Sequence, residues 1–414
     1  MRKGVTTHST IDNNDGNQET MTGSGTTHDT NKTLFQKPSK IQLETISPTG
    51  SANSDPCDLD DDEFTDPIPY EIGNRLEPEL FTDFKEAVIE NDELDKCFKK
   101  DIAWSIAGSL PSEFCEQKLP LLGPWTPFNK SVTQFFSDKC IQEYLPVTPH
   151  PPEYPVCKEY LDFLLEVIDE LELKFIFVHS DEAVYSKLCH ILWNNKDLYK
   201  RIILLMGGFH ELRVKQKLLF KRHSCRGFKQ WSVDAGTIAD GSADRAWEGR
   251  HYYRCMRVHK ECFDALVQYK FEHLTSNLEN IQEDLKNTLI SLRLKPTHAS
   301  LNELLSTDSF VTVVSQIRKC GDTEFSSGNI TLEYLKDVSS MLAMVSAVRE
   351  GCLERHLQSE REMIKQVFAF GHHNYARYLS YQYLSLRSME YKNHPAIVDL
   401  KENGFGGSIS GEPF

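Results

Sequence analysis

The sequence predicts an α/β protein in which helix predominates and a small, mainly parallel sheet forms the centre. Two apolar runs predict the sheet, KFIFVHSD at 174–181 and RIILLMGGFH at 201–210, with a segment of helical spacing between them. Short runs rich in β-branched and aromatic residues, joined by a helix, are typical of parallel strands covered on both faces. A third observation predicts a helical C-terminal part, because apolar residues recur at helical spacing over 330–350, 353–370 and 372–390.

The composition is that of a chain with a hydrophobic core. Hydrophobic residues make up 39% of the 414 residues and charged residues 26%, with a net charge of −15. This charge argues against nonspecific nucleic-acid binding by the chain as a whole. Eleven cysteines without CxxC pairs indicate a reducing compartment rather than a disulfide framework. We found no signal peptide and no bilayer-spanning run, so we expect an intracellular protein, nuclear or cytoplasmic, without a membrane partner.

Composition along the chain predicts three parts. Residues 1–66 are polar and acidic with few large apolar side chains, which predicts a disordered tail. Residues 67–156 form a lead-in, with a helix expected over 81–110 and a proline-rich extended connector over 144–156. Residues 157–414 hold the α/β core, which opens with a helix over 157–173. The chain stops at GFGGSISGEPF without a closing element, which predicts a truncated C-terminus.

Polar side chains follow both predicted strands. Asp181 ends the first apolar run and His210 ends the second. The carboxyl ends of parallel strands meet at one edge of a sheet, where α/β proteins gather their chemistry. The two residues therefore mark a candidate site. Asp181 could equally be the N-cap of the helix that begins AVYSKL, without any ligand.

A basic segment follows the second run. Between residues 196 and 231 there are ten Lys or Arg and only two acidic residues, a local net charge of +8. A solvated helix whose lysines extend around its flanks explains the pattern, and we favour it. The alternative is a surface that contacts a DNA backbone, with these candidate residues: Arg213, Lys215, Lys217, Lys221 and Arg222.

One predicted helix carries zinc-ligand residue types. His251, Cys255, His259 and Cys262 fall near one face of it. Ligands from a single helix cannot surround a tetrahedral ion, so His223 or Cys225 would have to complete the set. Buried cysteine beside hydrogen-bonded histidine is the interpretation that we favour.

Several motifs in order resemble a large uncharacterised, transposon-derived family common in corals, other marine invertebrates and fish. The resemblance covers about residues 124–414 and rests on these stretches: FNKSV, YLPVTPHPPEYPV, FVHSDEAVYSKLCHILW, LLMGGFHELR, DAGTIADGSADRAWEGRHYYRCMRVHK, SAVREGCLERHLQ, FAFGHHNYARYLSYQYLSLRSME and HPAIVDLKENGFGG. It implies a transposase-like protein with an RNase H-like or related core. The interval from His210 to Glu354 would then be a large helical insertion.

Such a core needs carboxylates clustered on its central sheet, because two Mg²⁺ ions bridge the attacking and leaving oxygens of a phosphodiester. The resemblance implies Asp181 and Glu354 as metal ligands, with His210 as a ligand or as the group that orients the leaving oxygen. A carboxylate on the first strand is also required, and the sequence offers none, since Asp162 falls in a helical pattern. The sequence therefore predicts a degenerate or incomplete transposase-like protein that would use Mg²⁺ if active. The alternative is a helical protein–protein interaction scaffold without catalytic activity, which could self-associate.

Overall fold

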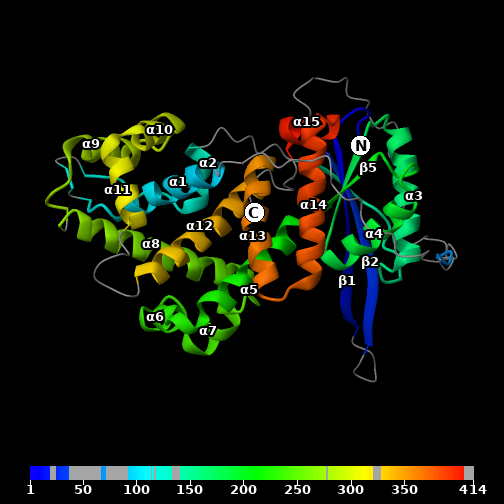
Figure 1. Cartoon of the computed structure of the whole chain (residues 1–414), viewed down its shortest axis with the longest axis horizontal. Coiled ribbons are helices and arrows are strands. Elements are labelled where there is room, and N and C mark those ends of the chain that lie inside the picture. The colour runs from blue at the N-terminus through cyan, green and yellow to red at the C-terminus, as the bar shows by residue number, and fades with distance from the viewer. Residues whose placement is uncertain are drawn as a thin grey trace, which may run out of the picture.

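The computed structural model describes residues 1–18, 25–36, 67–70, 92–112, 114–115, 118–132, 140–276, 278–319 and 328–404. Over these residues the chain is predominantly helical, with one small sheet at one end and a helical lobe at the other (Figure 1). The acidic run at 58–63, the start of the helix expected over 81–110 and the last ten residues lie outside the described residues.

Five strands form one mixed sheet in the order β3-β2-β1-β4-β5. β1 (Thr7–Gln18) pairs antiparallel with β2 (Gly25–Gln36), and β2 pairs antiparallel with β3 (Ile141–Tyr144). β1 also pairs in parallel with β4 (Ile176–Ser180), which pairs in parallel with β5 (Ile202–Met206). The two predicted strands are therefore β4 and β5. The sheet is mixed rather than mainly parallel, because an antiparallel hairpin and a short edge strand extend it on one side.

The opening hairpin lies inside the segment 1–66 that the sequence predicts to be a disordered tail. The structure differs from that prediction at residues 7–18 and 25–36, while residues 19–24 and 37–66 lie outside the described residues. β1 is held in part by polar contacts, which hydropathy does not register. The hydroxyl of Ser9 contacts the hydroxyl of Tyr160, and Tyr160 also donates a 3.2 Å hydrogen bond to the carbonyl of Thr10.

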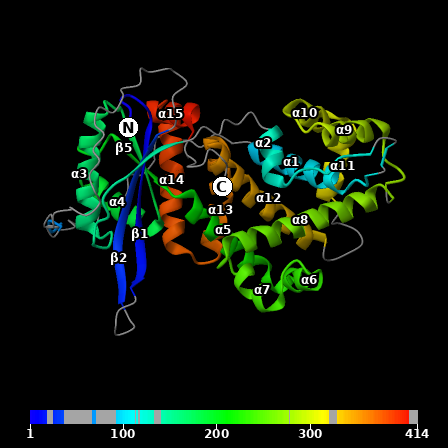
Figure 2. The ribbon, with the colours of Figure 1, turned by 180° about the vertical axis from the view of Figure 1, so that it is seen from behind.

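One face of the sheet is covered by α3 (Tyr154–Glu170) and α4 (Glu182–Asn194). Side chains alternate between the two faces of a strand, and Ile176 and Val178 of β4 pack on this side with Ile11 of β1. α3 begins three residues before the expected helix over 157–173, because Pro155 in its first turn needs no hydrogen-bond partner. Figure 2 shows α3 on the outer side of the sheet, away from the helical lobe.

The opposite face is covered by the last three helices, α13 (Leu353–Ala369), α14 (His373–Tyr391) and α15 (Pro395–Asn403). Phe177 of β4 and Leu205 of β5 pack on this side against apolar residues of these helices. The sheet is thus the middle layer of three, and the C-terminal part is helical as predicted.

Between β5 and α13 the chain forms the helical lobe, which occupies the interval predicted to be helical. Its helices are α5 (Gly208–His223), the 3-10 turn η1 (Ser224–Arg226), α6 (Phe228–Asp234), α7 (Asp240–Trp247), α8 (Tyr252–Leu274), α9 (Glu283–Leu294), α10 (His298–Ser306), α11 (Asp308–Lys319) and α12 (Gly328–Glu350). Two earlier helices, α1 (Asp92–Ser109) and α2 (Trp125–Val132), join the same hydrophobic core. Among the described helices, none is both long and apolar enough to cross a bilayer.

The place of β1 in the core can be tested by truncating Ile11, which is fully buried under α3. We expect Ile11→Ala to lower the free energy of unfolding by about 2–5 kcal/mol, because it removes buried methylene groups and leaves a cavity. Urea titration followed by circular dichroism measures this. Ile141→Ala is the matched control, since Ile141 on β3 is 38% exposed and should cost less than about 0.5 kcal/mol. If both variants and the parent unfolded at the same urea concentration, β1 would contribute nothing to the core.

Candidate functional site

The parallel pairing of β1 with β4 stops just before two aspartates, Asp12 and Asp181. The parallel register matches Ile11 with Ser180, so each aspartate is the next residue on its strand. His8 of β1 stacks on Phe177 of β4, on the face covered by α13 and α14. By alternation, Asp12 belongs to this same face, whereas Asp181 follows β4 and caps α4. The structure therefore supplies a first-strand carboxylate, which the sequence did not reveal.

His210 joins Asp12 from the first turn of α5. Its Nε2 lies 3.7 Å from Oδ2 of Asp12, and the two side chains are 32% and 51% exposed. The pair is thus open to solvent and to a substrate. Carboxylate oxygens of this kind are the ligands that Mg²⁺ prefers, and the ion usually keeps several waters and substrate oxygens in its shell. The arrangement where β1 stops pairing with β4 could hold a hard divalent cation.

Two glycines allow α5 to begin so close to the strand ends. The amide of Gly207 donates a 2.8 Å hydrogen bond to the carbonyl of Ser180, and a Cβ on Gly207 would lie 3.3 Å from the His210 ring. A Cβ on Gly208 would lie 2.7 Å from Val348 of α12, a contact too short without movement. The Gly-Gly pair of the GGFH motif is therefore explained by close packing of α5 between β4 and α12.

Asp181 has the N-cap role that the sequence offered as one alternative. Its Oδ1 accepts a 2.8 Å hydrogen bond from the amide of Val184. The other oxygen is not required by the cap, so capping and ligand binding are compatible. The start of α14 lies near Asp181. Burial raises the pKa of Tyr375 there, and the carboxylates of Glu182 and Asp181 raise it further.

Glu354 does not join Asp181 and His210. The guanidinium of Arg387 donates hydrogen bonds of 2.9 and 3.0 Å to both of its carboxylate oxygens, and Gln358 donates another of 2.9 Å. Burial alone would raise the pKa of Glu354, but the hydrogen bonds from Arg387 and Gln358 lower it below its usual value. Among the described residues, Asp181, His210 and Glu354 do not form a group with ligand atoms within 4.8 Å of one another. The helix was predicted correctly, but Glu354 serves there as an ion-pair partner.

The candidate DNA-contacting residues do not form one surface. Lys215 is almost fully buried and donates a 3.0 Å hydrogen bond to Gln366 of α13. Arg222 contacts both carboxylate oxygens of Asp337 on α12, at 3.0 and 2.9 Å. Both cations hold α5 against the neighbouring helices, so these two residues match neither the solvated flank that we favoured nor the alternative of a DNA-contacting surface.

The other three basic candidates lie closer to solvent. Lys221 is exposed and donates a 3.2 Å hydrogen bond to the carbonyl of Phe370. Lys217 is exposed and Arg213 is partly exposed. Arg213 and Lys217 are therefore the members of the set that stay available to an anionic partner.

The possible zinc ligands of α8 do not converge on an ion. Cys255 and His259 are fully buried, and Nδ1 of His259 lies 2.9 Å from the hydroxyl of Tyr334. His223 is hydrogen-bonded to Asp337 at 2.7 Å. In the part of the chain that the structure describes, these residues form no group with metal-ligand spacing. The favoured interpretation, buried cysteine beside hydrogen-bonded histidine, describes this helix.

A pair of histidines lies beneath the site. Nδ1 of His8 is 3.0 Å from Nε2 of His179, and the His8 ring also stacks on Phe35 and Phe177. Burial, and secondarily the charge of His356, lowers the pKa of His179 to about 4. The pKa of a histidine in the unfolded chain is about 6.5. The interior therefore requires this imidazole to stay neutral.

The chain belongs to the family described as "Domain of unknown function (DUF8702)", whose match spans residues 124–405. The match includes β3, β4, β5 and most of the helices. Asp181 and His210 lie within the matched residues. It leaves out β1, which carries Asp12. The comparison with curated proteins and the comparison with solved structures both give no match.

The lowered pKa of His179, a partly exposed side chain, predicts a dependence of stability on pH. Between about pH 6.5 and pH 4 the unfolded chain binds a proton at this position and the folded chain does not, so acidification destabilises the fold. The stabilisation is complete above about pH 6.5, and up to about 3 kcal/mol is lost as the pH falls to 4. His179→Gln should flatten this part of the curve in urea unfolding between pH 7 and pH 4. His273→Gln on α8, an exposed position, is the control and should keep the parent slope. If His179→Gln kept the pH dependence of the parent, the assignment of this dependence to His179 would be wrong.

Proposed function

We propose that this chain carries an RNase H-like core for metal-dependent cleavage or transfer of phosphodiesters, of the transposase type, with Asp12 and Asp181 as its metal ligands. The observation that carries the proposal is the register of β1 with β4, in which Asp12 and Asp181 each follow the last parallel pair, Ile11 with Ser180. Two adjacent carboxylates on a rigid sheet are the feature that two-metal chemistry needs.

The arrangement of the strands supports the same proposal. An RNase H-like core opens with an antiparallel hairpin and places its first carboxylate on the first strand. Here β1, β2 and β3 form the antiparallel part, and β4 and β5 extend β1 in parallel. The helical lobe between β5 and α13 corresponds to the insertion found in some transposases. Asp12 supplies the carboxylate whose absence made a degenerate enzyme the expectation from sequence.

The residues around the site would have different roles in catalysis. Asp12 and Asp181 would hold Mg²⁺, which when bound supplies Lewis-acid stabilisation of the phosphate and an activated water or hydroxyl. His210, 3.7 Å from Asp12, is placed to orient the leaving oxygen or to hold its proton. Glu354 is not part of this set, because Arg387 occupies both of its oxygens. Arg213 and Lys217, in the turns after His210, are placed to contact the phosphate backbone of DNA.

The proposal predicts a metal-dependent nuclease activity that fails without the aspartates. We expect the full chain to nick supercoiled plasmid DNA with Mg²⁺ or Mn²⁺, and Asp12→Asn or Asp181→Asn to reduce the rate by about 100-fold or more, because each removes a ligand of an ion worth several kcal/mol to the transition state. Gel electrophoresis of the plasmid over time measures the rate.

Asp169→Asn is the matched control. Asp169 is 72% exposed in a surface ion pair with Arg201, so its loss should leave the rate unchanged. Cleavage that persists in Asp12→Asn would refute the assigned site. A parent that neither cleaves DNA nor binds Mg²⁺ would leave the alternative function, a helical interaction scaffold.

A further inference from the structure

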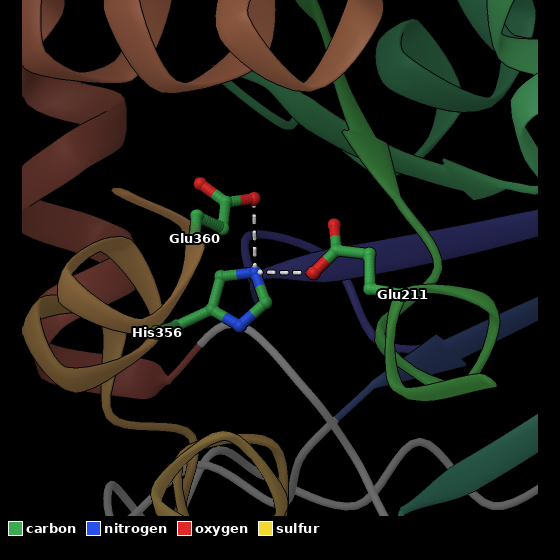
Figure 3. A group of neighbouring side chains, drawn as sticks. All are labelled: Glu211, His356 and Glu360. Atoms are coloured by element: carbon green, nitrogen blue, oxygen red, sulfur yellow. Dashed lines mark ion pairs between the residues drawn. The ribbon is translucent and has the colours of Figure 1, made fainter. Parts of the chain in front are cut away.

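Behind the strand ends, a second group of side chains has metal-ligand spacing. Glu211 lies on α5 next to His210 in sequence, and His356 and Glu360 lie one turn apart on α13 (Figure 3). Nε2 of His356 is 3.4 Å from Oε2 of Glu211 and 3.3 Å from Oε1 of Glu360. Glu211 and Glu360 are 0% exposed and His356 is 3% exposed. Among the described residues, it is the one group of three or more His, Cys, Asp or Glu with ligand atoms within 4.8 Å of one another.

The two carboxylates of this group are incompletely satisfied by the protein. Oε2 of Glu211 points at the imidazole, as Figure 3 shows, but receives no hydrogen bond from the described residues. Oε2 of Glu360 is also buried without a hydrogen bond from them. Two carboxylates and one imidazole leave a net negative charge in the interior, which is costly unless a cation or a proton compensates it. Burial, and next the charge of Glu360, raises the pKa of Glu211 well above its usual value.

We propose that Glu211, His356 and Glu360 form a buried binding site for one divalent transition-metal ion of the Zn²⁺ type. In a tetrahedral site with Zn–N and Zn–O bonds of ~2.0–2.2 Å, neighbouring ligand atoms lie ~3.3–3.6 Å apart. The distances from the imidazole nitrogen to both carboxylates have this length. A mixed nitrogen and oxygen set favours Zn²⁺ over Mg²⁺ or Ca²⁺, which prefer oxygen ligands alone.

Gln382 of α14 is placed as the outer partner of the ligands. Its amide nitrogen donates a 3.2 Å hydrogen bond to Oε1 of Glu211 and another to Oε1 of Glu360. Its amide oxygen accepts from the amide of Met206 at the end of β5. Such partners orient metal-ligating carboxylates and raise metal affinity. The site therefore joins α5, α13, α14 and β5 at one point.

The role of the ion is to fix the first turn of α5. Glu211 faces the buried group, while its neighbour His210 faces Asp12 at the rim. An ion held by Glu211 and by α13 would set the position of His210 without contacting a substrate. This site is separate from the aspartates of the proposed function, and it does not depend on that function.

Zinc binding by the full chain tests the proposal. The protein is stripped with a chelator and then titrated with Zn²⁺ by calorimetry, with metal content measured on a sample purified without chelator. We expect about one Zn²⁺ per chain and a rise in melting temperature on binding. Glu211→Gln should lower the affinity by about 100-fold or more, and Gln382→Leu by about 10- to 100-fold.

Matched variants distinguish zinc binding at this site from zinc binding elsewhere on the chain. Glu362→Gln on α13 makes the same change at a carboxylate that is 31% exposed and pairs with Lys365, and it should bind Zn²⁺ like the parent. A variant with both Asp12→Asn and Asp181→Asn should also keep the ion. Without metal, Glu211→Gln should melt no lower than the stripped parent, because it removes one of two like charges from the interior.

Three outcomes would overturn the proposal. The parent could contain no metal and show no shift with Zn²⁺, in which case a proton compensates the carboxylates. Glu211→Gln could bind as tightly as the parent, which would place the ion elsewhere. The variant with both Asp12→Asn and Asp181→Asn could lose the ion, which would show that the ion belongs to the site at the strand ends.

Discussion

The parallel pairing of β1 with β4 is the interaction on which the rest of the structure depends. It joins residues 7–11 to residues 176–180 and so places a segment from the start of the chain at the centre of the sheet. Without it β2 and β3 have no attachment to β4 and β5. The pairing is held by a few buried groups, with Ile11 under α3 and His8 between Phe35 and Phe177. A small number of contacts therefore determines both the sheet and the geometry of the candidate site.

The interior next to these strand ends is unusually polar for a protein core. His8 is buried within the sheet, and Glu211, His356, Glu360 and Gln382 are buried where α5, α13 and α14 meet. Each polar group costs free energy on burial unless it is matched by a partner. An apolar set of similar volume would satisfy the packing at lower cost. The polar set therefore favours a specific arrangement of the three helices over general stability, and that arrangement also positions His210.

The sequence predicts the parts of this fold whose inward faces are apolar. β4, β5 and the covering helices follow from their runs and spacing, and Asp181 and His210 follow from their positions after β4 and β5. β1 and β2 could not be predicted, because their buried residues include Thr7, Ser9 and Thr30, which hydropathy assigns to the solvent-exposed surface. The contacts of Glu354 and Glu360 could not be predicted for another reason. Both lie on α13, and which one pairs with Arg387 and which faces Glu211 depends on helices that the local pattern does not contain.

The long separation between β1 and its partners also governs the order in which the chain can fold during synthesis. The hairpin of β1 and β2 leaves the ribosome well before β4, and it stays an open-edged ribbon until about 150 further residues have been made. Its second face is covered only when α13–α15 arrive, and Thr6 then donates a hydrogen bond to Asp399 of α15. Closing so long a loop is slow, because the entropy is lost before the contacts form.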